Sequence, residues 1–273
     1  MTTATAPTAQ EASPTLARRR QFQLLTLVGP STIYLLLFFI IPLLIVLVYS
    51  FLKRGVYGQL IWELNLQNYV RVFDPLYLNI LWRSLIIALG NTLLCLLFSY
   101  PFAYYLARME SVRTRNLLLV FVMIPFWTNF LIRTYAWRVI LGNDGPINSI
   151  LLAVGLIKGM LPLLFTPFAV MVGLLYGYMP FMVLPLYAAI DRIDFSLVEA
   201  AQDLYASGWQ AFRKVVFPLS MPGVIAGSIL VFIPSLGAFV TPDLLGGAKT
   251  VMIGNLIQSQ FLTARDWPFG SSF

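Results

Sequence analysis

Residues 21–52 read QFQLLTLVGPSTIYLLLFFIIPLLIVLVYSFL and carry no charged side chain. A helix needs about 20 mostly apolar residues to cross the hydrocarbon core of a bilayer, so this stretch predicts a transmembrane helix. A cleaved signal peptide is the alternative, but a signal peptide has a shorter apolar core that ends at a small-residue cleavage site. The length of the stretch and the lack of such a site favour a membrane-spanning helix.

The composition extends this prediction to the rest of the chain. Of the 273 residues, 59% are hydrophobic and 11% are charged, and the mean hydropathy is +0.81. About a quarter of the residues of a soluble globular protein are charged, so this chain is not an ordinary soluble protein. It has no histidine and one cysteine, Cys95, which excludes disulfides, common metal sites and His-dependent catalysis within the chain. No metal, no cofactor and no enzymatic activity are expected.

Four more apolar blocks predict further spans. They lie at residues 84–107, 116–141, 158–191 and 214–243. The last two contain prolines, such as Pro180 and Pro222, which free helix carbonyls that need neighbouring helices or water. Five spans of this kind predict an all-α fold, a polytopic transmembrane helix bundle suited to transport.

Basic residues set the expected orientation, because Lys and Arg next to spans are retained on the cytoplasmic side. Residues 1–20 are rich in Thr, Ala, Pro and Ser and end in three arginines, so a disordered cytoplasmic tail is expected there. Residues 21–273 then form one transmembrane domain, with the loops at 108–116 and 191–214 on the cytoplasmic side. The net charge of +7 forms no dense stripe, so the expected partner is the lipid bilayer and not nucleic acid.

Two parts of the chain are less regular than the spans. The third block contains Arg133 and Arg138, which a membrane helix tolerates near an interface or beside a protein-lined cavity, and we expect both near the outer interface. Residues 250–264 are uncharged but too polar to span, so an interfacial or partly buried segment is expected. The stretch DWPFG at 266–270 has the composition of a loop.

The loop between the fourth and fifth spans is the most informative. Ser196 and Glu199 have the spacing of a capping box, which predicts a helix start. A turn is expected around residues 206–208, followed by a second helix at 209–216 that meets Pro218 at the membrane. One face of the first helix collects Leu197, Ala200, Ala201 and Leu204. Small residues allow close approach, so this face suits docking into a groove on a partner.

Residues 199–201 are Glu-Ala-Ala, and with Pro218 closing the loop they resemble the EAA loop of permease subunits of ATP-binding-cassette (ABC) importers. The family usually has glycine where this chain has Tyr205, and nearby Gly208 is expected to serve the turn. The resemblance implies that residues 191–218 form a coupling loop on a cytoplasmic ATPase. The implied coupling residues are Glu199, Ala200, Ala201, Leu204, Tyr205, Gly208 and Pro218. A solvated connecting loop is the alternative.

Other stretches are similar to the first permease of spermidine/putrescine-type importers. They are PFWTNFLIRTYAW at 125–137, GAFVTPDLLGG at 237–247, Gln260-Phe261, and DWPFG at 266–270. The resemblance covers about residues 22–273 and implies a type I ABC importer permease fold in the inner membrane. It also implies a sixth span that begins after residue 270, so a C-terminally truncated sequence is expected, with a five-span protein as the alternative.

The chain has no ATP-hydrolysing motif of its own, and this determines which partners are expected. No Walker motif is present, so ATP is expected to be hydrolysed by a separate subunit. The resemblance implies a cytoplasmic ABC ATPase dimer, a second homologous permease subunit and an extracytoplasmic substrate-binding protein. An ion-coupled secondary transporter is the alternative, but it would place coupling carboxylates inside spans that here are nearly free of acids.

The implied substrate is a polyamine, such as spermidine or putrescine, or another small organic solute. A path for a flexible polycation needs aromatic faces for cation–π contact and a few carboxylates. The candidates for this path are Trp127, Tyr135, Trp137, Tyr176, Tyr178 and Asp243. The alternative role is an interfacial belt or helix packing for the aromatic residues, and a helix-end carboxylate for Asp243.

Overall fold

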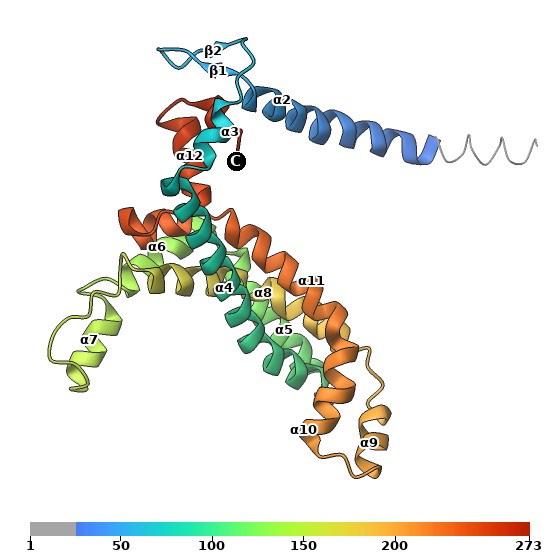
Figure 1. Cartoon of the computed structure of the whole chain (residues 1–273). Helices are drawn as coiled ribbons and strands as arrows, with labels where there is room; N and C mark the ends of the chain where they lie inside the picture. The colour runs from blue at the N-terminus through green and yellow to red at the C-terminus, as the bar shows by residue number, and fades with distance from the viewer. Residues whose placement is uncertain (1–25) are drawn as a thin grey trace, which may run out of the picture. The chain divides into compact units, whose positions relative to one another are not determined.

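The computed structural model describes residues 26–273 (Figure 1). These residues form two compact units. Of the described residues, the first unit contains 26–68 together with Asp266–Phe273, and the second contains Tyr69–Arg265. The predicted cytoplasmic tail, residues 1–20, lies outside the described residues. Helices make up nearly all regular structure in both units, which confirms the predicted all-α class.

The long helix of the first unit is the predicted first span. It covers Thr26–Ser50 and includes a π-helical turn, η1 (Leu36–Ile40), followed by α2 (Ile41–Ser50). Pro42 in the first turn of α2 has no N–H to donate, and the wide turn before it accommodates the missing hydrogen bond. The most apolar part of the helix has no buried residue, so in a membrane these side chains are left to lipid or to another helix.

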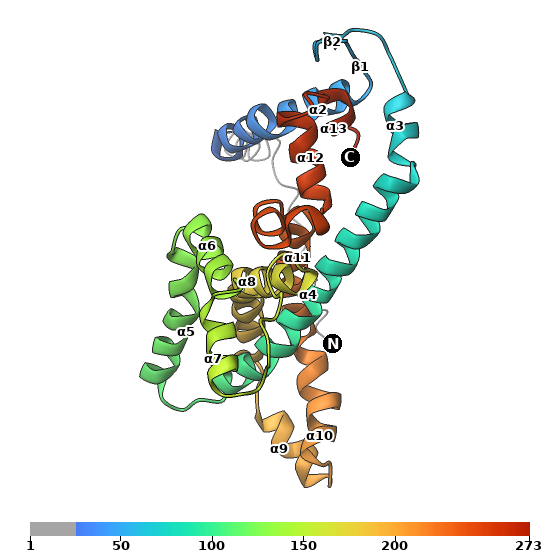
Figure 2. The ribbon, with the colours of Figure 1, turned by 90° about the vertical axis from the view of Figure 1, so that its left-hand side faces the viewer.

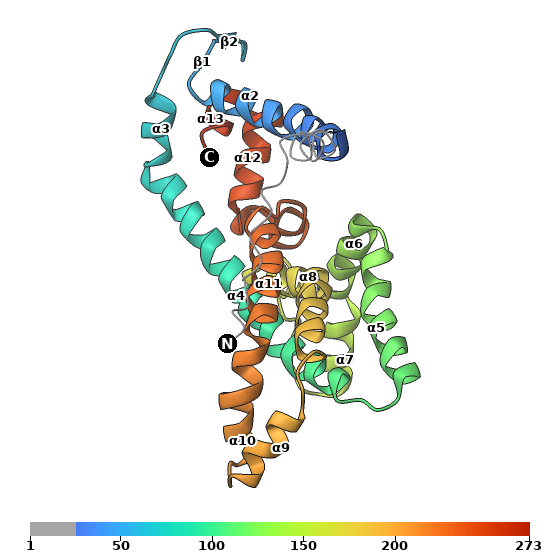
Figure 3. The same ribbon diagram turned by 90° about the vertical axis from the view of Figure 1, so that its right-hand side faces the viewer.

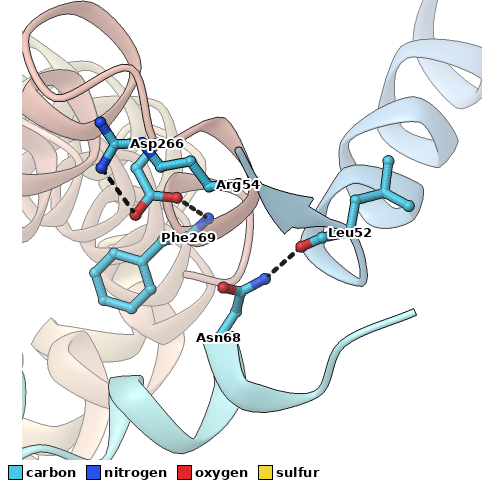
Figure 4. A network of polar contacts seen from close by, with 5 residues as sticks. All are labelled: Leu52, Arg54, Asn68, Asp266 and Phe269. Carbon is cyan, nitrogen blue, oxygen red and sulfur yellow. Dashed lines mark hydrogen bonds and ion pairs between the residues drawn. The ribbon is translucent and has the colours of Figure 1, made fainter. Parts of the chain in front are cut away.

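Asn68 closes the end of α2. A short antiparallel hairpin of β1 (Lys53–Arg54) and β2 (Leu60–Ile61) follows the helix. The buried Asn68 Nδ2 donates to the Ser50 carbonyl at 3.0 Å and to the Leu52 carbonyl at 2.9 Å, and Figure 4 shows the second contact. Carbonyls at a helix end have no intrahelical partner, so this amide supplies one.

Residues 266–270, expected to form a loop, contain a one-turn helix, α13 (Trp267–Gly270), so that expectation was wrong. The buried Asp266 accepts a hydrogen bond from the Phe269 amide at 3.2 Å and lies 4.0 Å from Arg54 Nη1 (Figure 4). A carboxylate at a helix N-terminus satisfies amides that lack an intrahelical acceptor. This cap, together with the full burial of Phe269, explains why the stretch is ordered as a turn of helix.

Three long helices form the core of the second unit: α4 (Pro75–Ala107), α8 (Pro167–Ile190) and α11 (Phe217–Leu236). Each belongs to a helix that is long and apolar enough to cross a membrane, as predicted. At Gly223 of α11 an added Cβ would lie 2.5 Å from the Ala189 Cβ and 2.7 Å from the Pro185 carbonyl oxygen of α8. Such small residues let membrane helices approach closely.

The block predicted as the third span, residues 116–141, contains two helices. α5 (Val112–Trp127) and α6 (Phe130–Ile140) meet at a 90° bend, so residues 26–273 contain four candidate spans, or up to five if the bent pair counts as one. Asn129 caps α6 by accepting from the Leu131 amide at 2.9 Å. Thr128 Oγ1 donates to the Pro125 carbonyl at 2.7 Å. Asparagine favours helix starts because its side chain accepts from backbone amides, and here this local preference interrupts the apolar run.

Short helices lie at opposite ends of the second unit. The segment with α9 (Ser196–Asp203) and α10 (Gly208–Ala211) is at one end, and α12 (Ile253–Leu262) is at the other, as Figure 2 and Figure 3 show. The expectation of a partly buried segment at 250–264 is confirmed by α12. The remaining short elements are α3 (Gln67–Val72), α7 (Pro146–Ala153), η3 (Pro242–Gly246) and η4 (Gly247–Lys249).

Candidate functional site

The loop at 191–218 begins with a cap that the sequence analysis assigned to the wrong residue. Asp194 Oδ1 accepts a hydrogen bond from the Ser196 amide at 3.0 Å, and Ser196 is already the first residue of α9. The predicted capping box of Ser196 with Glu199 is therefore wrong. The backbone and side-chain hydrogen bonds from Ser196 hold the pKa of Asp194 below its ordinary value, so its carboxylate stays ionised at neutral pH.

The face of α9 predicted for docking is partly buried against the protein and partly exposed. Val198 is buried and Ala201 packs beside it against the core of the second unit. Leu197 is 48% exposed and Leu204 is 81% exposed. Glu199 is also exposed, and its carboxylate makes no hydrogen bond or ion pair within residues 26–273. An apolar edge and a free carboxylate thus face outward from the loop.

The turn after α9 is built around Tyr205. Its φ is +62°, its amide donates to the Gln202 carbonyl at 2.9 Å, and the next amide, from Ala206, reaches the Ala201 carbonyl at 3.1 Å. This pair of bonds is a Schellman motif, whose left-handed residue is usually glycine. The expectation that Gly208 serves the turn is wrong, because Gly208 has no positive φ and is the first residue of α10. The 98% exposed Tyr205 ring stands outside the fold.

A capping box missed by the sequence analysis starts α10. Ser207 Oγ accepts from the Gln210 amide at 3.3 Å, and Gln210 Oε1 accepts from the Ser207 amide at 2.9 Å. The Ser-x-x-Gln spacing was the available signal. The helix then continues through the π-helical turn η2 (Phe212–Val216) into α11, so the predicted end of the second helix at residue 216 is wrong. A wider turn ahead of a proline reduces the clash of its ring with the preceding carbonyls.

Aromatic side chains tie the loop to α4. The Tyr100 ring lies 5.5 Å from the Phe212 ring in an edge-to-face arrangement, and its hydroxyl lies 2.7 Å from Ser220 Oγ. Tyr104 makes edge-to-face contacts with Phe195 at 6.2 Å and with Phe212 at 6.3 Å. Edge-to-face aromatic pairs stabilise a packing arrangement by about 0.5–1.5 kcal/mol beyond the area that they bury. These contacts pack the loop directly against α4.

The aromatic path candidates do not form one cluster. Only Trp137 and Tyr176 among them are in ring contact within residues 26–273, at 5.5 Å. Trp127 is 81% exposed and Tyr135 is 51% exposed. Tyr178 donates from its hydroxyl to the Pro234 carbonyl at 3.3 Å and so joins α8 to α11. The packing role is supported for Tyr178.

Arg133 occupies the aromatic face that the path hypothesis would leave for a substrate. Its guanidinium carbon lies 5.8 Å from the Tyr176 ring centre and 5.6 Å from that of Phe130. Arg133 Nη1 donates to the Pro125 carbonyl at 2.8 Å, across the bend between α5 and α6. The Arg133 guanidinium thus has the Pro125 carbonyl and two aromatic rings as partners. Partners of this kind allow a membrane helix to accommodate an arginine.

Asp243 lies in η3, an element that packs against α6 and α8. It lines a pocket of about 380 Å³ together with polar residues of α12, among them Gln258 and Ser259. The sequence analysis missed these two residues. The only sign of them in the sequence was that both are polar residues within 250–264. Their proximity to Asp243 becomes evident only from the position of α12.

Comparison with protein families and curated proteins gives consistent matches. Residues 99–269 match the family described as "Binding-protein-dependent transport system inner membrane component". The chain is 46% identical over 249 residues to the spermidine/putrescine transport system permease protein PotB of Escherichia coli strain K12, covering 91% of this chain and 89% of that protein. It is 45% identical over 239 residues to the protein of the same name from Haemophilus influenzae, covering 88% and 83%. The inner membrane ABC transporter permease protein YdcU of E. coli is 34% identical, covering 77% and 71%.

Solved structures support the same fold. A bacterial ABC transporter involved in the import of the acidic polysaccharide alginate matches with a TM-score of 0.66 and 19% identity, covering 93% of this chain and 89% of that chain. The bacterial alginate ABC transporter in complex with an alginate pentasaccharide-bound periplasmic protein matches with a TM-score of 0.68 and 18% identity, covering 93% and 88%. At this level of identity the likeness establishes the fold alone.

Proposed function

This chain belongs to the family of binding-protein-dependent transport system inner membrane components, and on that basis we propose that it carries spermidine and putrescine through the inner membrane. It is a multi-pass permease subunit of an ABC importer and not itself an enzyme. The observation that carries the substrate assignment is the 46% identity over 91% of the chain to a spermidine/putrescine permease. The polyamine is moved by this subunit, and the energy comes from ATP hydrolysis on another chain.

The 191–218 loop is the proposed contact with a cytoplasmic ATPase dimer. Glu199, Ala200, Leu204 and Tyr205 offer an exposed carboxylate, a small residue and apolar side chains at its tip, while Ala201 holds α9 against the core. Such a surface suits insertion into a groove, where apolar burial provides affinity and the carboxylate provides register. Gly208 and Pro218 position the following helix instead of contacting the ATPase directly.

The orientation and the remaining partners are proposed on the same basis. Arg192, Arg213 and Lys214 are exposed at the α9–α10 end of the second unit, which supports a cytoplasmic location for this end and for the N-terminus. A second homologous permease and an extracytoplasmic substrate-binding protein complete the assembly. A related fold has been solved with a periplasmic protein bound, which supports the last of these partners. Residues 21–273 then act as one permease domain.

The proposed mechanism is alternating access. Closure of the ATPase dimer displaces α9 and α10, and the Tyr100–Phe212 contact passes this displacement to α4 and α11. Packed helices have discrete arrangements, so a small shift at the loop switches the bundle between cavities open to either side. ATP hydrolysis then releases the loop and resets the bundle.

The test is ATP-dependent uptake of radiolabelled putrescine and spermidine in proteoliposomes that contain the chain with its partner subunits. Removing a charge from a protein interface typically costs several kcal/mol, so Glu199→Ala is expected to lower uptake about 10-fold or more while the complex still copurifies. The matched control is Glu110→Ala, an exposed acid in the neighbouring loop between α4 and α5. Uptake of another solute alone would reject the polyamine assignment, and uptake without the ATPase would reject the importer.

A further inference from the structure

Residues of η3 and α12 line a polar pocket. Figure 3 shows α12 at the end of the second unit opposite α9 and α10. The volume of the pocket is about 380 Å³. The residues that line it are Asp243, Val251, Asn255, Gln258, Ser259, Leu262 and Thr263. All of them are described in the structure, and none is a lysine or an arginine. The pocket wall therefore carries one negative charge and several neutral oxygen atoms.

One face of α12 supplies most of this wall. The four lining positions on α12 have the i, i+3, i+4, i+7 spacing of a single helix face. The other side of α12 is held against the protein by Ile253, Gly254 and Leu256, which are buried. At Gly254 an added Cβ would lie 2.5 Å from the Gly237 carbonyl oxygen, so α12 is packed tightly in this orientation. The polar face is thus directed at the pocket by close packing behind it.

Two of the side chains that line the pocket, Asp243 and Gln258, have no partner among the described residues, and a third, Asn255, fixes the position of α12. Within residues 26–273 the Asp243 carboxylate and the Gln258 amide make no hydrogen bond or ion pair. Asn255, in contrast, accepts from the Met252 amide at 3.2 Å and donates from Nδ2 to the Phe239 carbonyl at 2.6 Å. The Asp243 amide donates to the same Phe239 carbonyl at 3.1 Å. Asn255 therefore ties α12 to the backbone that carries Asp243.

The chemistry of the wall matches an alkylammonium group. A primary ammonium brings a positive charge and three N–H donors, and it needs an anion and neutral oxygen acceptors. Asp243 is exposed, so its carboxylate is open to a cationic group that enters the pocket. We propose that this pocket binds one ammonium end of the transported polyamine, with Asp243 as its charge partner and Gln258 and Ser259 as neutral acceptors. This inference rests on the proposed function and adds a substrate subsite to it.

The test separates transport from ATP hydrolysis in the full complex reconstituted with its binding protein. Asp243→Asn is expected to lower the rate of spermidine uptake at saturating substrate about 10-fold, the typical loss for a hydrogen bond to a charged group. ATP hydrolysis stimulated by the loaded binding protein is expected to stay within about 2-fold, so the number of polyamines moved per ATP falls. Asp243→Glu keeps the charge and is expected to retain most uptake, and Gln258→Leu is expected to lose less than Asp243→Asn.

The control is Asp144→Asn, which removes an exposed acid from the loop between α6 and α7, on the same predicted side of the membrane. Unchanged uptake per ATP in Asp243→Asn, with wild-type uptake intact, would overturn the subsite and leave the proposed function standing. An equal loss in Asp144→Asn would show a general surface-charge effect and would also overturn it. Absence of polyamine uptake by the wild-type complex would instead overturn the proposed function itself.

Discussion

The Tyr100 hydroxyl lies 2.7 Å from Ser220 Oγ and joins α4 to α11 beside the 191–218 loop. Both side chains are buried, and the Tyr100 ring also meets Phe212 of η2. A single tyrosine of α4 therefore contacts the helix that leaves the loop at two points, one in η2 and one in α11. This arrangement gives a displacement of the loop a direct route into the membrane helices.

Tyr100→Phe tests this route. The substitution keeps the ring packing and removes the hydroxyl, so we expect a loss of about 1 kcal/mol of stability, because Ser220 retains its 2.9 Å bond to the Phe217 carbonyl. The number of polyamines taken up per ATP hydrolysed is also expected to fall, even at temperatures where the variant stays fully folded. Thermal unfolding in detergent and coupled uptake assays measure the two effects. Normal coupling in a destabilised variant would contradict a role in transmission.

Tyr205→Gly tests the strained turn after α9. A non-glycine residue at left-handed φ costs about 1–2 kcal/mol relative to the right-handed region, so glycine is expected to stabilise the turn by roughly that amount at most. Amide hydrogen exchange in α9 and α10 measures the change. Tyr205→Ala is the matched control, because it removes the ring but keeps the Cβ. Equal gains from both substitutions would mean that the ring, and not the backbone, is the source of the cost.

Arg133→Ala tests the bend between α5 and α6. It removes a hydrogen bond from a charged donor to the Pro125 carbonyl and two cation–π contacts, so a loss of about 1.5–3 kcal/mol is expected. Thermal unfolding of the purified complex measures it. Arg138→Ala is the control, since Arg138 lies 5.8 Å from the Phe165 ring and is expected to contribute less. A larger loss in the control would contradict the assigned role of Arg133.

Asp194→Asn tests the cap of α9 and its pH dependence. The folded-state pKa of Asp194 lies below the unfolded value, so its contribution is present above the unfolded pKa and is lost as the pH falls through the folded pKa. The variant is therefore expected to increase amide exchange at the start of α9 near neutral pH, with a smaller difference from wild type in acid. A difference that grew on acidification would reverse the sign and contradict this account.

Much of the membrane architecture could be predicted from the sequence. Uncharged runs identified the first, second, fourth and fifth spans, because burial in lipid depends on the length and composition of each segment alone. The Glu-Ala-Ala segment with Pro218 identified the family, and the comparisons confirmed it. The roles of the coupling and path residues stay predictions.

Other features depended on local competition that the sequence left open. Asn129 interrupts an apolar run with a 90° bend, and the helix passes through Pro218 without ending. Tyr205, and not the nearby Gly208, takes the left-handed position. At Asn129 and Tyr205 local hydrogen bonds accompany the observed conformation: the Leu131 amide donates to Asn129, and the Tyr205 amide donates to the Gln202 carbonyl.

The sequence by itself determined that the chain spans a membrane and to which family it belongs, because these depend on segments read one at a time. Only the tertiary structure decided that Tyr176 already contacts Arg133 and that Gln258 shares a pocket with Asp243. The members of each pair lie on different elements, α6 with α8 and η3 with α12, so only packing brings them together; at Gly254 of α12 an added Cβ would lie 2.5 Å from the Gly237 carbonyl oxygen.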